Sequence, residues 1–101
     1  MTASAKGDVL LLAGVDNVAV ALRPLEPGES VIVEQARLRV VRAVPAGHKI
    51  AVKSIGRGEH ILKYGQVMGR ATETIAAGDH VHVHNVEGIR GRGDLAPERP
   101  R

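Results

Sequence analysis

The chain has 101 residues, of which 44% are hydrophobic, and a formal net charge of +3 at pH 7. This length predicts one small domain. Residues 90–101 hold four arginines and two acidic residues, and the rest of the chain has 10 basic and 9 acidic residues. A nearly neutral body without a clustered basic face argues against a nucleic-acid partner.

Composition also limits the chemistry and the location. The chain has no Cys, which excludes disulfide bonds and thiolate chemistry. The apolar run at residues 9–13 is far shorter than the ~20 residues that span a membrane, and we see no secretion signal. We therefore expect a cytoplasmic protein without membrane contact.

The apolar residues predict an all-β fold of short strands and tight turns. The chain has no Phe or Trp and a single Tyr, so aliphatic side chains must form the core, while 12 Gly and 5 Pro supply turns. We expect a flexible N-terminus at residues 1–7, a domain at residues 8–88 and a flexible basic tail at residues 89–101. Strands are expected at residues 8–13, 17–22, 31–35, 37–44, 49–54, 60–63, 66–71 and 80–86.

One turn pattern occurs four times. An aliphatic residue is followed by Gly three positions later and by a second aliphatic residue six positions later. The four copies begin at Leu25, Val44, Ile55 and Ile75. Each predicts a tight turn between two strands, with Gly at positive φ. Residues 17–21 also resemble residues 49–53, which indicates either an internal duplication or the same local solution used twice. Gly69 indicates a bulge or the close approach of another backbone.

The most informative stretch is residues 80–85, where three histidines alternate with valines. Successive side chains of a strand point to opposite faces, so the three imidazoles would share one face. His82 and His84, with a third ligand from His48 or His80, could hold a divalent metal ion. The alternative is a solvated strand face, and His80 is the histidine of the three that we expect to be merely exposed.

Other polar residues give weaker signals. His48 lies in a turn, either as a functional loop residue or as an ordinary polar one. Lys63 and Tyr64 end a strand and could hold a carboxylate through an ammonium and a hydroxyl donor. Alternatively, Tyr64 packs in the core with its hydroxyl at the surface. His60 is expected at the surface. The chain has no nucleophile motif and no phosphate loop. Because a domain of 101 residues is a poor host for a complete active site, we expect it to work with a partner chain.

Five motifs occur in a telling order: DNVAVAL at residues 16–22, GHKIA at 47–51, ILKYG at 61–65, Gly69, and a last segment at 75–85 with IAAG and HVHN. Together they resemble the N-terminal domain of altronate dehydratase and galactarate dehydratase. That domain belongs to the SAF group, which has a β-clip fold, and the resemblance covers about residues 8–88.

The resemblance implies a small subunit of a sugar-acid dehydratase, which eliminates water to give a 2-keto-3-deoxy acid together with a separate large subunit. It implies a divalent metal, iron or manganese, bound at His82 and His84 or mainly by the large subunit. The implied catalytic residues are His48, His82 and His84. The implied substrate-binding residues are Lys63, Tyr64 and Asn85.

Two other functions stay open. The chain also resembles the small subunit of (2R)-sulfolactate sulfo-lyase, which cleaves a carbon–sulfur bond. A freestanding SAF module that binds a ligand without catalysis is the third reading. An open strand edge would also allow a homodimer.

Overall fold

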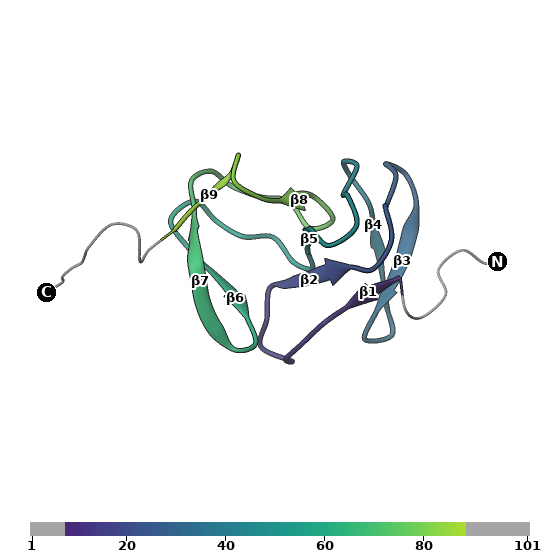
Figure 1. Cartoon of the computed structure of the whole chain (residues 1–101), viewed down its shortest axis with the longest axis horizontal. Helices are drawn as coiled ribbons and strands as arrows, with labels where there is room; N and C mark the ends of the chain where they lie inside the picture. The colour runs from purple at the N-terminus through teal and green to yellow at the C-terminus, as the bar shows by residue number, and fades with distance from the viewer. Residues whose placement is uncertain (1–7, 89–101) are drawn as a thin grey trace, which may run out of the picture.

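The computed structural model describes residues 8–88, and these form short strands in three antiparallel sheets, without a helix (Figure 1). The predicted all-β fold is confirmed. Within this part of the chain, no helix exists that could cross a membrane. The predictions for residues 1–7 and 89–101 lie outside the described residues.

The central sheet separates two smaller ones (Figure 1). Its strands, in spatial order, are β1 (Val9–Leu10), β2 (Val18–Ala21), β5 (Lys49–Ala51) and β8 (His80–Val81). The hairpin at one end consists of β3 (Ser30–Val33) and β4 (Ala36–Arg39). The sheet at the other end consists of β6 (His60–Lys63), β7 (Gln66–Ala71) and β9 (Val86–Glu87).

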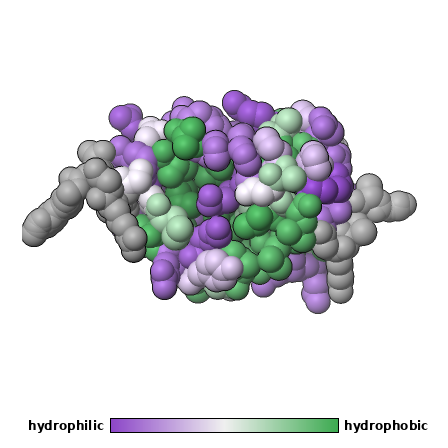
Figure 2. All heavy atoms as spheres, in the orientation of Figure 1, coloured by the Kyte–Doolittle hydropathy of each residue, from purple (hydrophilic) through white to green (hydrophobic). Residues whose placement is uncertain are grey.

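Two aliphatic cores share the central strands. Because successive side chains of a strand point to opposite faces, β2 and β5 supply both. Ala19 and Ile50 enter the first core, beside the β3–β4 hairpin, whereas Val18 and Ala51 enter the second, beside β6 and β7. Burial of each Val or Ile side chain stabilises the fold by about 1.5–3 kcal/mol. The stability of the cores therefore comes from many aliphatic side chains rather than from a few large aromatic ones. In the face shown by Figure 2, apolar side chains reach the surface in separate areas with polar side chains between them.

The four predicted turns all form. Their glycines have positive φ values: Gly28, Gly47, Gly58 and Gly78. The aliphatic residues that begin the turns pair in two β-bridges, Leu25 with Val44 and Ile55 with Ile75, and all four are buried. The turns therefore join in two pairs, one pair in each core.

Hydrogen bonds set the register between the two halves of the domain. The amide of Gly47 donates to the carbonyl of Ala21, and the amide of Gly78 donates to that of Ala51, at 2.8 and 2.7 Å. Residue 21 therefore corresponds to residue 51, whereas the sequence resemblance paired residue 21 with residue 53. The halves do repeat, with a register two residues away from the expected one.

The β3–β4 and β6–β7 hairpins repeat as well. Their two-residue turns, Glu34–Gln35 and Tyr64–Gly65, have positive φ at every position, as a type I′ turn requires. In the second hairpin, the register shifts between Ile61 and Leu62, which leaves Met68 as the extra residue of a bulge in β7, next to Gly69. A Cβ on Gly69 would lie 2.7 Å from a carbonyl oxygen of β9. Both the bulge and the close approach predicted at Gly69 are confirmed.

The predicted strand at residues 80–86 is wrong. Strand β8 ends at Val81, and residues 82–85 form a turn. The side chain of Asn85 is the cause: its Oδ1 accepts a hydrogen bond from the amide of His82 at 3.0 Å, and its Nδ2 donates to the carbonyl of His80 at 2.9 Å. These local bonds replace the ladder that a continuous strand would need. The histidines therefore do not alternate along one strand.

Other predicted strands also end earlier than expected: those at residues 8–13, 37–44 and 49–54 end at Leu10, Arg39 and Ala51. After Leu10 the chain enters a turn that Asp16 closes, since its Oδ2 accepts a hydrogen bond from the amide of Ala13 at 3.1 Å. Strand β4 ends at Arg39. The amide of Val40 still donates to the carbonyl of Glu29, but that of Val41 donates to the carbonyl of Gly78, so the backbone leaves the hairpin after Val40.

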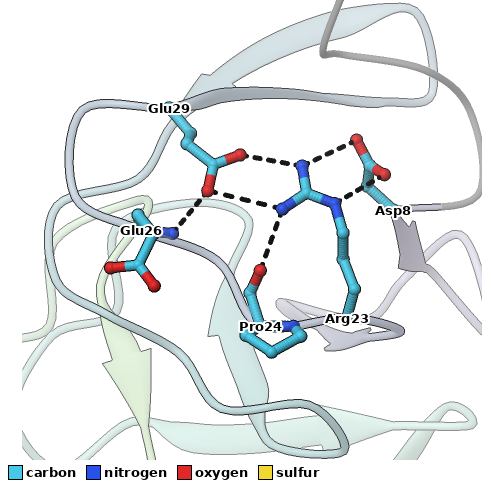
Figure 3. Close-up of polar contacts among 5 residues, drawn as sticks. All are labelled: Asp8, Arg23, Pro24, Glu26 and Glu29. Carbon is cyan, nitrogen blue, oxygen red and sulfur yellow. Dashed lines mark hydrogen bonds and ion pairs between the residues drawn. The ribbon is translucent and has the colours of Figure 1, made fainter.

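An ionic cluster fixes the first turn (Figure 3). The guanidinium of Arg23 donates to Asp8 Oδ1 at 3.0 Å and to Glu29 Oε1 at 2.7 Å. Glu29 also accepts a hydrogen bond from the amide of Glu26. The pKa of Glu29 is lowered, mainly by the hydrogen bond from Arg23. The cluster ties the start of β1 to the turn before β3.

Candidate functional site: a histidine cluster beside a lysine-lined pocket

Three imidazoles converge where β5 pairs with β8. The register matches Lys49 with Val81, so the next opposed pair outward is His48 and His82, with His80 diagonal to His48. The rings of His48 and His82 stack with centroids 4.0 Å apart, and His48 Nδ1 lies 2.9 Å from His80 Nε2. One nitrogen from each ring lies within 4.8 Å of the others. We call His48, His80 and His82 the histidine cluster.

The cluster differs from the predicted ligand set. His80 is half-buried and belongs to the cluster, so its predicted plain exposure is wrong. His84 is exposed, and its ring centroid lies 5.1 Å from that of His80. The roles assigned to His84 stay predictions. His60 lies at the surface, as predicted.

The surroundings of His80 and His82 favour their neutral imidazoles. Desolvation lowers the pKa of His80, and repulsion from the neighbouring histidines lowers it further. The pKa of His82 is also lowered, by desolvation first and then by the charges of His48 and Lys49. A neutral imidazole has one free nitrogen lone pair, which can accept a proton or bind a metal ion.

The donor set fits a divalent transition metal. Imidazole nitrogens suit zinc, iron, copper and nickel, with bonds of about 2.0–2.1 Å to zinc. Two nitrogens on one such ion are therefore at most ~4.2 Å apart. The widest separation in the cluster needs a small side-chain adjustment, which half-buried rings at the domain surface allow.

A pocket of about 240 Å³ adjoins the cluster. Its lining residues are Lys49, Ile61, Met68, Val81, His82, Val83, Val86 and Gly88. Burial lowers the pKa of Lys49, and the charge of Lys63 lowers it further. Among residues 8–88, no carboxylate forms an ion pair with either lysine. The pocket therefore combines one uncompensated cation with mostly apolar walls.

The other predicted site residues lie around this region in different environments. Tyr64 is 65% exposed at the tip of the β6–β7 hairpin, so the alternative in which it packs in the core is wrong. The ammonium of Lys63 lies 5.9 Å from the centroid of the Tyr64 ring. Asn85 is buried and holds the turn after β8. The substrate contacts assigned to these three residues stay predictions.

Sequence reasoning gave no role to two buried polar residues that hold this hairpin. Asp16 Oδ2 accepts a hydrogen bond from the amide of Tyr64 at 2.8 Å, and Oδ1 accepts one from the amide of Gly65 at 2.7 Å. Asn17 bonds to the carbonyl of His60 and the amide of Leu62. The sequence does contain a pattern that could have predicted this role, because adjacent Asp and Asn before an apolar run favour side-chain to backbone hydrogen bonds.

Residues 8–88 match the family described as the altronate/galactarate dehydratase SAF domain. The altronate dehydratase of Escherichia coli (strain K12) is 45% identical over 71 residues, which is 70% of this chain and 14% of the relative. That of Bacillus subtilis (strain 168) is 40% identical over 72 residues, or 71% of this chain and 14% of the relative. The (2R)-sulfolactate sulfo-lyase subunit alpha of Chromohalobacter salexigens is 41% identical over 51 residues, covering 50% of this chain and 54% of the relative. The aligned region thus spans a small part of the altronate dehydratases.

Proposed function

Because this chain belongs to the altronate/galactarate dehydratase SAF domain family, we propose that it is the small subunit of a sugar-acid dehydratase. The observation that carries the proposal is the histidine cluster, placed beside a pocket that holds an unpaired lysine. Neutral nitrogen donors next to a cation suit a reaction in which a proton leaves the carbon beside a carboxylate. We propose that the chain works in the cytoplasm.

The reaction would remove a proton from C2 of an aldonate or aldarate and hydroxide from C3, which yields a 2-keto-3-deoxy acid after the enol rearranges. His48, His80 and His82 would hold a divalent iron or manganese ion, which supplies Lewis acidity to a bound oxygen. His84, which lies outside these three residues, would be the candidate to accept or return a proton. Lys63 and Tyr64 would contact the polar end of the substrate from the β6–β7 hairpin.

A separate large chain is the second part of the proposal. The aligned region makes up 14% of each altronate dehydratase, so most of those enzymes lies outside this module. The sulfolactate relatives are called subunit alpha, a name that describes one chain of a larger enzyme. The histidine cluster sits at the surface of this domain, where a second chain could complete it.

The test is purification of the chain from its native cells at low salt, followed by mass spectrometry of its partner and metal analysis. We expect one stoichiometric large chain, bound iron or manganese, and formation of a 2-keto-3-deoxy acid from altronate or galactarate. A chain that stays alone and leaves both acids unchanged would contradict the proposal and favour the freestanding binding module.

A sulfo-lyase subunit is the second candidate, favoured by one observation. The sulfolactate relatives are short: the aligned regions are 54% and 73% of their lengths. The purified complex assayed with (2R)-sulfolactate would release sulfite if this candidate is right. Release of water from altronate or galactarate, without sulfite from sulfolactate, would exclude it.

A further inference from the structure

Lys49 and Lys63 are both half-buried and without a described carboxylate partner, but of the two only Lys49 lines the pocket. Lys49 lies at the start of β5. Arg23, Arg42 and Arg70 each have a carboxylate partner, whereas no described carboxylate pairs with Lys49. Burying an ammonium without a counter-charge is unfavourable, so the site gains stability when an anion enters.

The walls of the pocket restrict that anion. Around Lys49 stand the aliphatic side chains of Ile61, Val81 and Val86, with Met68 at 49% exposure and Val83 at 81% exposure. A volume of about 240 Å³ admits a small organic acid or one end of a longer one. Lys49 and His82 are the polar side chains of the lining, so they would orient the charged end of such an acid.

The substrates named by the two groups of relatives share one such end. Altronate and sulfolactate each have a carboxylate on C1, a hydroxyl on C2 and a leaving group on C3, but differ beyond it. A module common to both groups of enzymes is best suited to the common part of their substrates. The part that differs would then meet the large chain.

We propose that this pocket binds the 2-hydroxycarboxylate end of the substrate, with Lys49 as the anchor of its carboxylate. The substrate class rests on the proposed function, while the anion pocket rests on the geometry of Lys49 and its neighbours. With its carboxylate on Lys49, the substrate would hold C2 in the pocket that His82 also lines. Lys63 adds positive potential nearby, as its effect on Lys49 indicates.

The first experiment is an NMR titration of the full 101-residue chain, treated with EDTA, with galactarate and with (2R)-sulfolactate. Galactitol, which has the same carbon chain without carboxylates, is the uncharged control. We expect both acids to shift the same backbone amides, those of Lys49, His82 and Val83, and galactitol to shift none of them. Shifts confined to other surfaces, or no shifts with either acid, would overturn the proposal.

Variants separate charge from shape. Lys49→Met keeps the long side chain and removes the charge, and we expect it to weaken binding of both acids by about 10-fold or more, as for loss of a charged hydrogen bond. Lys49→Arg should retain most of the affinity. Lys53→Met is the matched control, because Lys53 is exposed and lines a different pocket. Equal affinity of Lys49→Met and wild type would overturn the proposal.

A second readout tells this inference apart from the proposed function. In the purified complex, Lys49→Met should raise KM for the acid, while Co²⁺ binding to the chain stays unchanged. A complex that dehydrates its substrate equally well with Lys49→Met would refute the anchor and leave the dehydratase proposal standing. A chain that binds both acids through Lys49 but has no partner and no lyase activity would support the anchor and refute the dehydratase proposal.

Discussion

The carboxylate of Asp16 holds the hairpin that carries Lys63, and Asp16→Asn tests how strongly. One oxygen accepts hydrogen bonds from the amides of Ala13 and Tyr64, and the other accepts one from Gly65. Whichever way the new amide turns, at least one N–H loses its acceptor and faces another donor. An unsatisfied buried donor costs about 1–3 kcal/mol, and the remaining bonds lose their charge assistance. We expect the free energy of unfolding to fall by about 2–4 kcal/mol.

That loss is large against the about 4–12 kcal/mol expected for a domain of this size. The melting temperature should fall by roughly 10–25 °C, measured by circular dichroism, and urea unfolding gives the free energy. Asp8→Asn is the matched control, because it removes a partly exposed ion pair with Arg23 worth up to about 1 kcal/mol. A loss in Asp16→Asn no larger than in Asp8→Asn would refute the reasoning.

Three further predictions follow from particular contacts. Gly69→Ala should lower the free energy of unfolding by about 1–3 kcal/mol, because the new Cβ meets the backbone of β9; a urea midpoint equal to that of wild type would contradict it. The hydrogen bond from Arg23 lowers the pKa of Glu29 in the folded state, so its stabilisation is present above the unfolded pKa and is lost as pH falls through the folded pKa. The stability gap between wild type and Glu29→Gln should therefore shrink as pH falls in urea titrations, and a constant gap would exclude this linkage. His80→Asn should weaken Co²⁺ binding about 10-fold or more in visible absorption, whereas the exposed control His60→Asn should not; equal weakening would remove His80 from the site.

The turns and the fold class were predictable because they depend on local physics. Gly28, Gly47, Gly58 and Gly78 adopt a backbone conformation that other residues rarely do, and the aliphatic residue three positions before each one is buried. Aliphatic β-branched residues, with no helical periodicity, left an all-β fold as the solution. Gly69 also predicted a contact between distant segments, because the absence of a side chain lets the backbone of β9 approach closely.

The site was predicted only in part, because its assembly depends on pairing between distant segments. The alternating histidines suggested a strand, yet the hydrogen bonds of Asn85 close a turn that alternation cannot reveal. The turn before His80 predicts an exposed side chain. The contact with His48 is not visible in that local pattern, because the two residues are 32 positions apart in the sequence. Met68, which lines the pocket together with Lys49, lies in the bulged strand β7, and no sequence pattern predicts that it does so.

The internal repeat explains why the histidine cluster occurs once. Strand β5 pairs with β8 as β2 pairs with β5, so the opposed positions His48 and His82 correspond to Val18 and Ala51. In the earlier copy this pair is covered and belongs to the second core. In the later copy β8 is the edge of the central sheet, so the same position opens to solvent. Polar imidazoles are tolerated there because water, substrate or a second chain can satisfy their nitrogens, which they could not do inside an aliphatic core. The histidine cluster thus lies where the repeat of this domain ends.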